Sequence, residues 1–154
     1  MSDGDRREPA PTLELERFLP YRLSVLSNRI STAIADVYEE RFGIGITQWR
    51  VVAVLGRYPD LSAGEVAERT AMDKVAVSRA VAGLLDKGLV QRDVHGDDRR
   101  RSVLRLSRAG RRLHAQVAPL ALRIEQSLLS PLDARERVQL HALLDKLGDG
   151  LKAL

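Results

Sequence analysis

The spacing of the apolar residues changes within this chain, and the change limits the folds that it can adopt. Between residues 62 and 87 apolar side chains recur every three or four positions, as they do on one buried face of a helix. In residues 89–94 and 102–106 the period shortens towards two, which is typical of strands. Two short helices followed directly by a hairpin predict a helix-turn-helix with a wing.

The ends of these elements carry recognisable local signals. Ser62 and Glu65 form the Ser-x-x-Glu pattern of a capping box, and Asp73 is a suitable N-cap for the next helix. Gly88 is suited to ending that helix, and residues 95–98 supply turn residues between the two strands. The segment 73–87 is therefore predicted to be the second helix of the helix-turn-helix.

Long amphipathic helices are predicted on both sides of this region. Apolar residues at steps of three and four mark residues 13–45 and again residues 108–154, where Pro119 predicts a kink. Thr47 is the predicted N-cap of a short helix before the capping box. We therefore expect a mainly α chain with about six helices, a two- or three-stranded wing and a flexible tail over residues 1–12.

Arginine is concentrated where the wing is predicted. The 25 Lys and Arg residues exceed the 21 Asp and Glu residues, and the resulting net charge of +4 fits almost any soluble protein. The stretch from Arg99 to Arg112 nevertheless holds seven arginines and no acidic residue. A charge run is commonly a solvated face, but this one begins at a predicted hairpin tip beside Lys74 and Arg79. In that position it would meet nucleic-acid phosphates.

Several other classes of protein are disfavoured by what the chain lacks. Without cysteine there is no disulfide scaffold, thiolate metal site, thiol nucleophile or thiol-based peroxide sensor. His95, His114 and His141 do not have metal-ligand spacing, and neither a phosphate-binding glycine loop nor a nucleophile elbow is present. No apolar run approaches the roughly 18 residues of a membrane span, and the first residues do not read as a secretory signal. We expect a cytoplasmic protein that is not an enzyme and uses no cofactor or metal.

The order and spacing of several motifs resemble the MarR family of bacterial transcriptional regulators, over most of the chain. The motifs are Met72-Asp73-Lys74 with Val77-Ser78-Arg79, Leu84-x-x-Lys87-Gly88-Leu89-Val90, Asp98-x-Arg100, and Leu104-x-Leu106-Ser107-x-x-Gly110. The resemblance implies a winged helix-turn-helix homodimer in which residues 13–45 and 108–154 form the dimerisation helices and residues 46–107 bind double-stranded DNA. It further implies a regulator, and a repressor released by a small aromatic or anionic ligand is expected.

By the same resemblance, the helix from Asp73 to Lys87 enters the major groove, where Lys74, Ala76, Ser78 and Arg79 contact the DNA. Arg79 either reads a guanine edge or contacts a phosphate. Ser78 either contacts DNA or bonds back to its own helix, and Ala76 either touches a thymine methyl group or contacts nothing.

The resemblance also implies a second DNA contact, made by the wing. Arg100 reaches into the minor groove, where narrow segments attract cations. Asp98 either holds the Arg100 guanidinium by a charge-assisted hydrogen bond or is a plain turn residue. Arg99 and Arg101 are expected to contact phosphates.

The chain has more leucines near its two ends than a small winged domain could bury, so a homodimer is expected. Alternatively, the terminal helices pack against each other within one chain. The leucines are Leu19, Leu23, Leu26, Leu140, Leu143, Leu144 and Leu147. A two-fold dimer predicts a pseudo-palindromic operator with half-sites about 34 Å apart.

A ligand pocket near the dimer helices is a further expectation from the resemblance. Tyr21, Arg22, Ser24 and Trp49 could line it, and an arginine beside aromatic rings suits a carboxylate-bearing aromatic ligand. Trp49 could equally be a core residue, and Arg22 a surface residue or part of a dimer salt bridge. Two other functions stay open, an architectural or constitutive DNA-binding protein without effector control and a winged helix that binds proteins.

Overall fold

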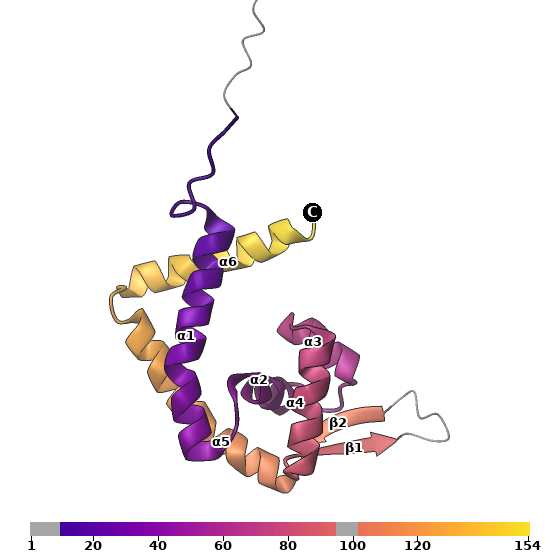
Figure 1. The fold of residues 1–154 in the computed structure, drawn as a ribbon. Helices are drawn as coiled ribbons and strands as arrows, with labels where there is room; N and C mark the ends of the chain where they lie inside the picture. The colour runs from indigo at the N-terminus through magenta and orange to yellow at the C-terminus, as the bar shows by residue number, and fades with distance from the viewer. Residues whose placement is uncertain (1–9, 95–101) are drawn as a thin grey trace, which may run out of the picture.

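The computed structural model describes residues 10–94 and 102–154 (Figure 1). Within these ranges the chain forms six helices and two strands. Their bounds are α1 Leu19–Phe42, α2 Ile46–Arg57, α3 Ala63–Thr70, α4 Lys74–Asp86, β1 Val90–Val94, β2 Ser102–Leu106, α5 Arg108–Leu129 and α6 Ala134–Leu151. The expected mainly α fold with a helix-turn-helix and a wing is confirmed.

Capping residues set the starts of α3 and α4. The Ser62 hydroxyl accepts a hydrogen bond from the Glu65 N–H at 3.1 Å, and the Glu65 carboxylate accepts one from the Ser62 N–H at 2.7 Å. The bond from the Ser62 backbone is the main reason that the pKa of Glu65 lies below its usual value. Asp73 caps α4 by accepting from the N–H groups of Val75 and Ala76. Both predicted caps are confirmed.

Two helix starts differ from the expectation. α1 begins at Leu19 rather than near Leu13, because Pro20 has a fixed φ and no N–H and therefore suits the first turn of a helix. The predicted N-cap at Thr47 is wrong, since α2 is capped by Gly45 and Thr47 lies inside the helix. Gly43 ends α1 in a left-handed conformation with φ 65°, and α2 begins three residues later, at Ile46.

The apolar residues are buried in two adjoining clusters. The larger lies inside the winged helix-turn-helix and consists of Val51, Val52, Leu55, Leu61, Val66, Ala67, Val77, Ala80, Val81, Leu84, Val90, Leu104 and Leu106. The smaller lies where α1, α2 and α5 meet, around Tyr38, Ile44, Leu113 and Val117. Trp49 packs against both clusters, so the winged region and the long helices share a continuous core.

The wing is an antiparallel pair of strands. Val90 of β1 lies opposite Leu106 of β2, and the pairing continues to Val94 opposite Ser102. A single bridge adds a third segment, because the Leu104 N–H donates to the Leu61 carbonyl at 2.7 Å. The tip of the hairpin lies outside the described residues.

The start of α5 is fastened to the turn between α4 and β1. The buried Ser107 hydroxyl donates to the Gly88 carbonyl at 2.6 Å and accepts from the Gly110 N–H at 3.0 Å. A Cβ atom at Gly110 would lie 2.0 Å from the Leu89 carbonyl oxygen, so only glycine fits. From this anchor α5 leads away from the wing, and its two halves run in different directions around Pro119 (Figure 1).

We expect Gly110→Ala to lower the free energy of unfolding by about 2 kcal/mol, because the added methyl group would force the Leu89 backbone and the first turn of α5 apart. Urea denaturation followed by circular dichroism at one fixed protein concentration measures this. Gly64→Ala is the matched control, since the nearest atom to its Cβ would be the Ser62 hydroxyl oxygen at 3.8 Å. Equal effects of the two changes would contradict the proposed close contact.

Candidate nucleic-acid interface and ligand pocket

The outward face of α4 carries three of the four side chains that the resemblance assigns to the major groove. Lys74, Ser78 and Arg79 are exposed, whereas Ala76 is half-buried. The opposite face of α4 packs into the core through Val77, Ala80, Val81 and Leu84. Val75 is also exposed and was not predicted as a site residue, although its place outside the apolar stripe of the helix was a usable signal.

Within the described parts of the chain, Lys74 and Arg79 of α4 form no ion pairs. In residues 10–94 and 102–154 no carboxylate oxygen lies within 4.0 Å of Lys74 or Arg79. Arg79 lines a groove of about 540 Å³ together with Ala76, Gln48 and Glu39. Both positive charges can therefore approach an anionic partner from the exposed side.

The N-terminus of α4 itself is occupied. The carboxylate of Asp73 accepts hydrogen bonds from the N–H groups of Val75, at 2.8 Å, and Ala76, at 3.1 Å. A full negative charge therefore stands where the partial positive charge of the helix dipole would otherwise attract a phosphate. At this end of α4, contacts to phosphates are therefore expected from side chains.

The wing residues Asp98, Arg99, Arg100 and Arg101 lie outside the described residues, so their assigned contacts stay predictions.

Two other members of the arginine run serve the fold. Arg105 lies 2.7 Å from a carboxylate oxygen of Asp60 and 3.0 Å from one of Asp93, which holds the base of the wing to the loop after α2. Arg111 donates to the carbonyl of Leu106 at 3.1 Å. The arginines of this run look alike in the sequence, but in the structure they make different contacts.

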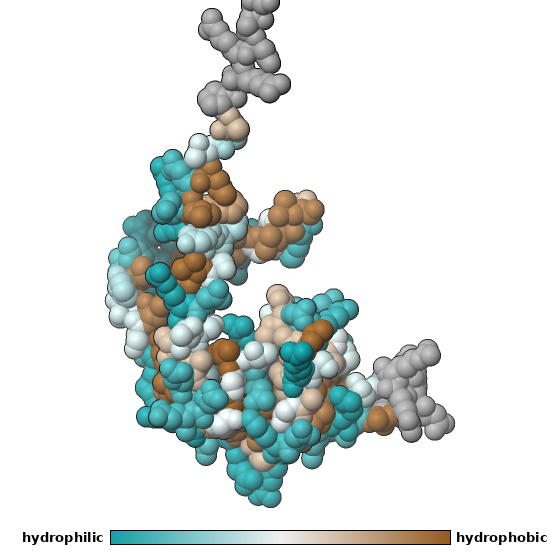
Figure 2. Space-filling model, in the orientation of Figure 1, coloured by the Kyte–Doolittle hydropathy of each residue, from teal (hydrophilic) through white to brown (hydrophobic). Residues whose placement is uncertain are grey.

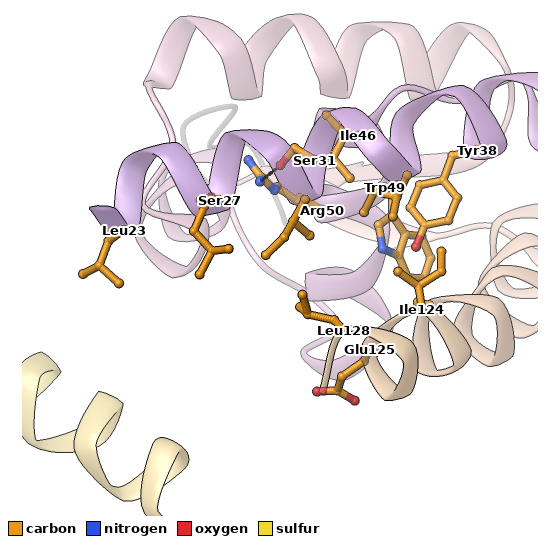
Figure 3. Close-up of a pocket in the computed structure, with 14 residues that line it drawn as sticks. Leu23, Ser27, Ser31, Tyr38, Ile46, Trp49, Arg50, Ile124, Glu125 and Leu128 are labelled. Atoms are coloured by element: carbon orange, nitrogen blue, oxygen red, sulfur yellow. Dashed lines mark hydrogen bonds between the residues drawn. The ribbon is translucent and has the colours of Figure 1, made fainter. Parts of the chain in front are cut away.

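A cavity of about 440 Å³ opens between α1, α2 and α5 (Figure 3). Its wall is mainly apolar. It consists of Leu23, Leu26, Ser27, Ile30, Ser31, Ile34 and Tyr38 from α1, Ile46, Trp49 and Arg50 from α2, and Ala121, Ile124, Glu125 and Leu128 from α5.

The polar groups of the cavity are few and unequal. Arg50 is half-buried, and its guanidinium donates to the Ser31 hydroxyl at 3.0 Å. Tyr38 is only 1% exposed, and burial raises the pKa of its hydroxyl, which therefore stays protonated at neutral pH. The Glu125 carboxylate points away from Arg50 (Figure 3). The cavity therefore offers one cation, one carboxylate and three hydroxyl groups among aliphatic and aromatic side chains.

Trp49 forms the aromatic centre of this junction. Its ring centroid lies 5.9 Å from that of Tyr38, in an edge-to-face arrangement, and 5.7 Å from that of His114. These contacts link α1, α2 and α5 beside the cavity. Trp49 thus packs against the core and lines the cavity at once.

Of the four residues expected at a ligand pocket, Trp49 lines the cavity, whereas Tyr21, Arg22 and Ser24 are exposed on α1 and do not line it. The cation of the cavity is Arg50, which sequence reasoning missed. Its signal was an arginine within the apolar segment of α2.

The described residues contain no cluster of three His, Cys, Asp or Glu side chains that could hold a metal ion. None of the helices within the described ranges is both long and apolar enough to cross a membrane.

The comparisons with known proteins agree with this architecture. A sequence profile described as the MarR family matches residues 42–101. The HTH-type transcriptional regulator BilQ of Clostridium symbiosum is 30% identical over 114 residues, which cover 74% of this chain and 78% of that protein. The chain belongs to the MarR family. It is therefore a DNA-binding transcriptional regulator and not an enzyme.

Solved structures of MarR-family regulators have the same fold. A MarR/EmrR family transcriptional regulator from Acinetobacter sp. ADP1 matches with a TM-score of 0.86 and 29% identity, over 92% of this chain and 100% of that one. PcaV from Streptomyces coelicolor, solved in complex with its natural ligand, matches with a TM-score of 0.71 and 26% identity, over 90% of this chain and 97% of that one.

We expect Arg79→Ala to weaken binding to the specific operator by about 5- to 150-fold, because a bidentate contact to guanine is worth about 1–3 kcal/mol. Fluorescence anisotropy with an operator duplex and a random duplex at the same salt concentration measures both affinities.

Arg123→Ala is the control for this prediction, because it removes the same charge from an exposed position on α5. An equal loss of affinity on both duplexes would assign Arg79 to a phosphate instead of a base.

Proposed function

We propose that this MarR-family chain is a cytoplasmic, homodimeric repressor that releases its operator when an aromatic carboxylate enters the cavity between α1, α2 and α5. The observation that carries the proposal is the half-buried Arg50 guanidinium in a mainly apolar wall. A cation in such surroundings is costly unless it is paired. Within the described residues its one hydrogen-bond partner is the neutral Ser31 hydroxyl, so a ligand carboxylate would supply the missing countercharge.

The aromatic part of the ligand follows from the remaining wall. Trp49 supplies a ring, and the protonated Tyr38 hydroxyl supplies a donor beside it. A cavity of about 440 Å³ that is mainly apolar with a few polar groups fits a small molecule with one charged end.

The DNA contacts in this proposal belong to α4, with Lys74, Ser78 and Arg79 in the major groove and the wing arginines Arg99–Arg101 on the flanking DNA. The exposure of these α4 side chains and the absence of ion pairs to them in the described residues support the assignment.

Hydrogen bonds between the end of α4 and the two helices α1 and α2, which line the cavity, support release by a ligand. The Lys87 ammonium, at the end of α4, donates to the Gly43 carbonyl at the end of α1 and to the Gln48 side chain of α2 at 3.1 Å. A ligand wedged between α1 and α2 would shift both acceptors and tilt α4. Two recognition helices of a dimer must lie about 34 Å apart to meet successive major grooves, so a small tilt is enough to lower affinity.

Homodimer formation is supported by apolar surface that the single chain leaves uncovered. None of the residues of α6 is buried, and Leu143 is 57% exposed. The N-terminal half of α1 also exposes leucines, among them Leu23 and Leu26. Figure 2 shows these apolar patches on α1 and at the end of α6, away from the winged region. Exposed apolar patches of this kind are typical of an interface with a second copy.

We expect at least one member of a panel of benzoate-type carboxylates to change the emission of Trp49, the only tryptophan of the chain, and to weaken operator binding. The corresponding benzamides, which lack the charge, should bind about 10- to 100-fold more weakly, as expected for a lost charge-assisted hydrogen bond.

Arg50→Met keeps an unbranched side chain and removes the charge, and it should abolish the preference for carboxylates over amides while operator binding persists. Arg22→Met is the matched control, because Arg22 does not line the cavity. If no compound of the panel alters operator binding, the alternative of a constitutive regulator without effector control is favoured.

We expect Leu144→Glu to convert the dimer to a monomer and to lower operator affinity by at least 100-fold, because each half-site is then bound separately. Sedimentation velocity gives the mass of the particle. Ala63→Glu, which adds the same charge at an exposed position of α3, should leave the dimer intact. A chain that sediments as a monomer before any substitution would refute the dimer.

A further inference from the structure

An apolar side chain stands in the middle of the DNA-facing surface of α4. Among the described residues of the winged helix-turn-helix, 46–94 and 102–107, three large apolar side chains are exposed, namely Tyr58, Val75 and Val94. The ring of Tyr58 is covered by two arginines, with the Arg69 guanidinium 3.9 Å and that of Arg57 5.0 Å from its centroid. Val75 is 57% exposed and lies on the recognition helix itself.

Helix geometry places Val75 among the polar contacts rather than beside them. Ser78 and Arg79 follow it by three and four residues, and such pairs are neighbours on a helix surface. At about 100° per residue, Val75 falls between Ser78 and Arg79 around the helix axis, and Lys74 lies on the other side of Ser78. An unbroken contact surface on α4 therefore includes the valine.

The neighbouring residues allow this side chain to approach a base edge. Ser78 and Ala82, which are both exposed and small, occupy the same face and let the helix lie deep in a groove. Val75 is in the first turn of α4, and side chains on a helix point towards its N-terminus. The Asp73 carboxylate already accepts a hydrogen bond from the Val75 N–H, so Val75 presents only its isopropyl group to a partner.

We propose that Val75 packs against the 5-methyl group of a thymine in the major groove and thereby requires a thymine at that position of each operator half-site. The thymine methyl is the apolar group that base edges display in the major groove, and it suits a side chain without donors or acceptors. Cytosine has no 5-methyl group, so it would lose this apolar contact. The inference rests on the DNA-binding role of α4.

Deoxyuridine, which differs from thymidine only by the missing methyl group, isolates this contact. An operator is first selected from a random duplex pool with the full wild-type chain, and each thymine of one half-site is then replaced in turn. We expect one position at which deoxyuridine weakens wild-type binding by about fourfold, the effect of one buried methyl group. The same replacement should have no effect on Val75→Ala, so the two losses should not add.

Two variants keep the result interpretable. Ser78→Ala changes the same face without touching the valine, so its sensitivity to deoxyuridine should equal that of the wild type. Val75→Ala alters an exposed position and introduces a better helix former, so its circular dichroism should match the wild type.

Two results would overturn the inference, and they are distinguishable. If Val75→Ala stays as sensitive to every deoxyuridine replacement as the wild type, Val75 contacts no thymine methyl group, while operator binding by α4 stands. If the wild-type chain selects no sequence at all, the sequence-specific role of α4 fails together with this contact.

Discussion

The position of α5 depends on one close approach of two backbone segments. Gly110 meets the Leu89 carbonyl without room for a side chain, and Ser107 ties the same turn to α5 by two hydrogen bonds. Because the turn follows α4 directly, the recognition helix and the long helix are held at one fixed angle. That angle and the change of direction within α5 together place Ile124 and Leu128, which form the third wall of the cavity.

Arginine side chains have different roles in this molecule, and the surroundings of each arginine determine its role. Arg105 is held between two carboxylates at the base of the wing, so its charge is neutralised within the fold. Arg79 has no such partner in the described residues and faces outward. Arg50 lies half-buried in an apolar wall, where an uncompensated charge is most costly. A count of arginines cannot separate these cases.

The prediction from sequence succeeds where the interacting groups are close along the chain. The caps formed by Ser62 and Asp73 bond to N–H groups two or three residues away, so the local pattern contains both partners. It fails at Thr47, because the N-cap of α2 is Gly45, which has no side chain that a capping pattern could reveal.

The amino-acid sequence by itself determined the helix-turn-helix, the wing and the caps of α3 and α4, since apolar period and capping chemistry act over a few residues. The order and spacing of its motifs also carried the resemblance to the MarR family. Tertiary structure decided that Arg50, and not Arg22, lines the cavity. The cavity exists only where α5 meets α1 and α2, and the α5 residues that line it lie more than 70 positions after those of α2. Tertiary structure likewise decided which arginines remain available to DNA. Arg105 pairs with Asp60 because two segments far apart in the sequence come into contact, and local sequence spacing cannot predict such a contact.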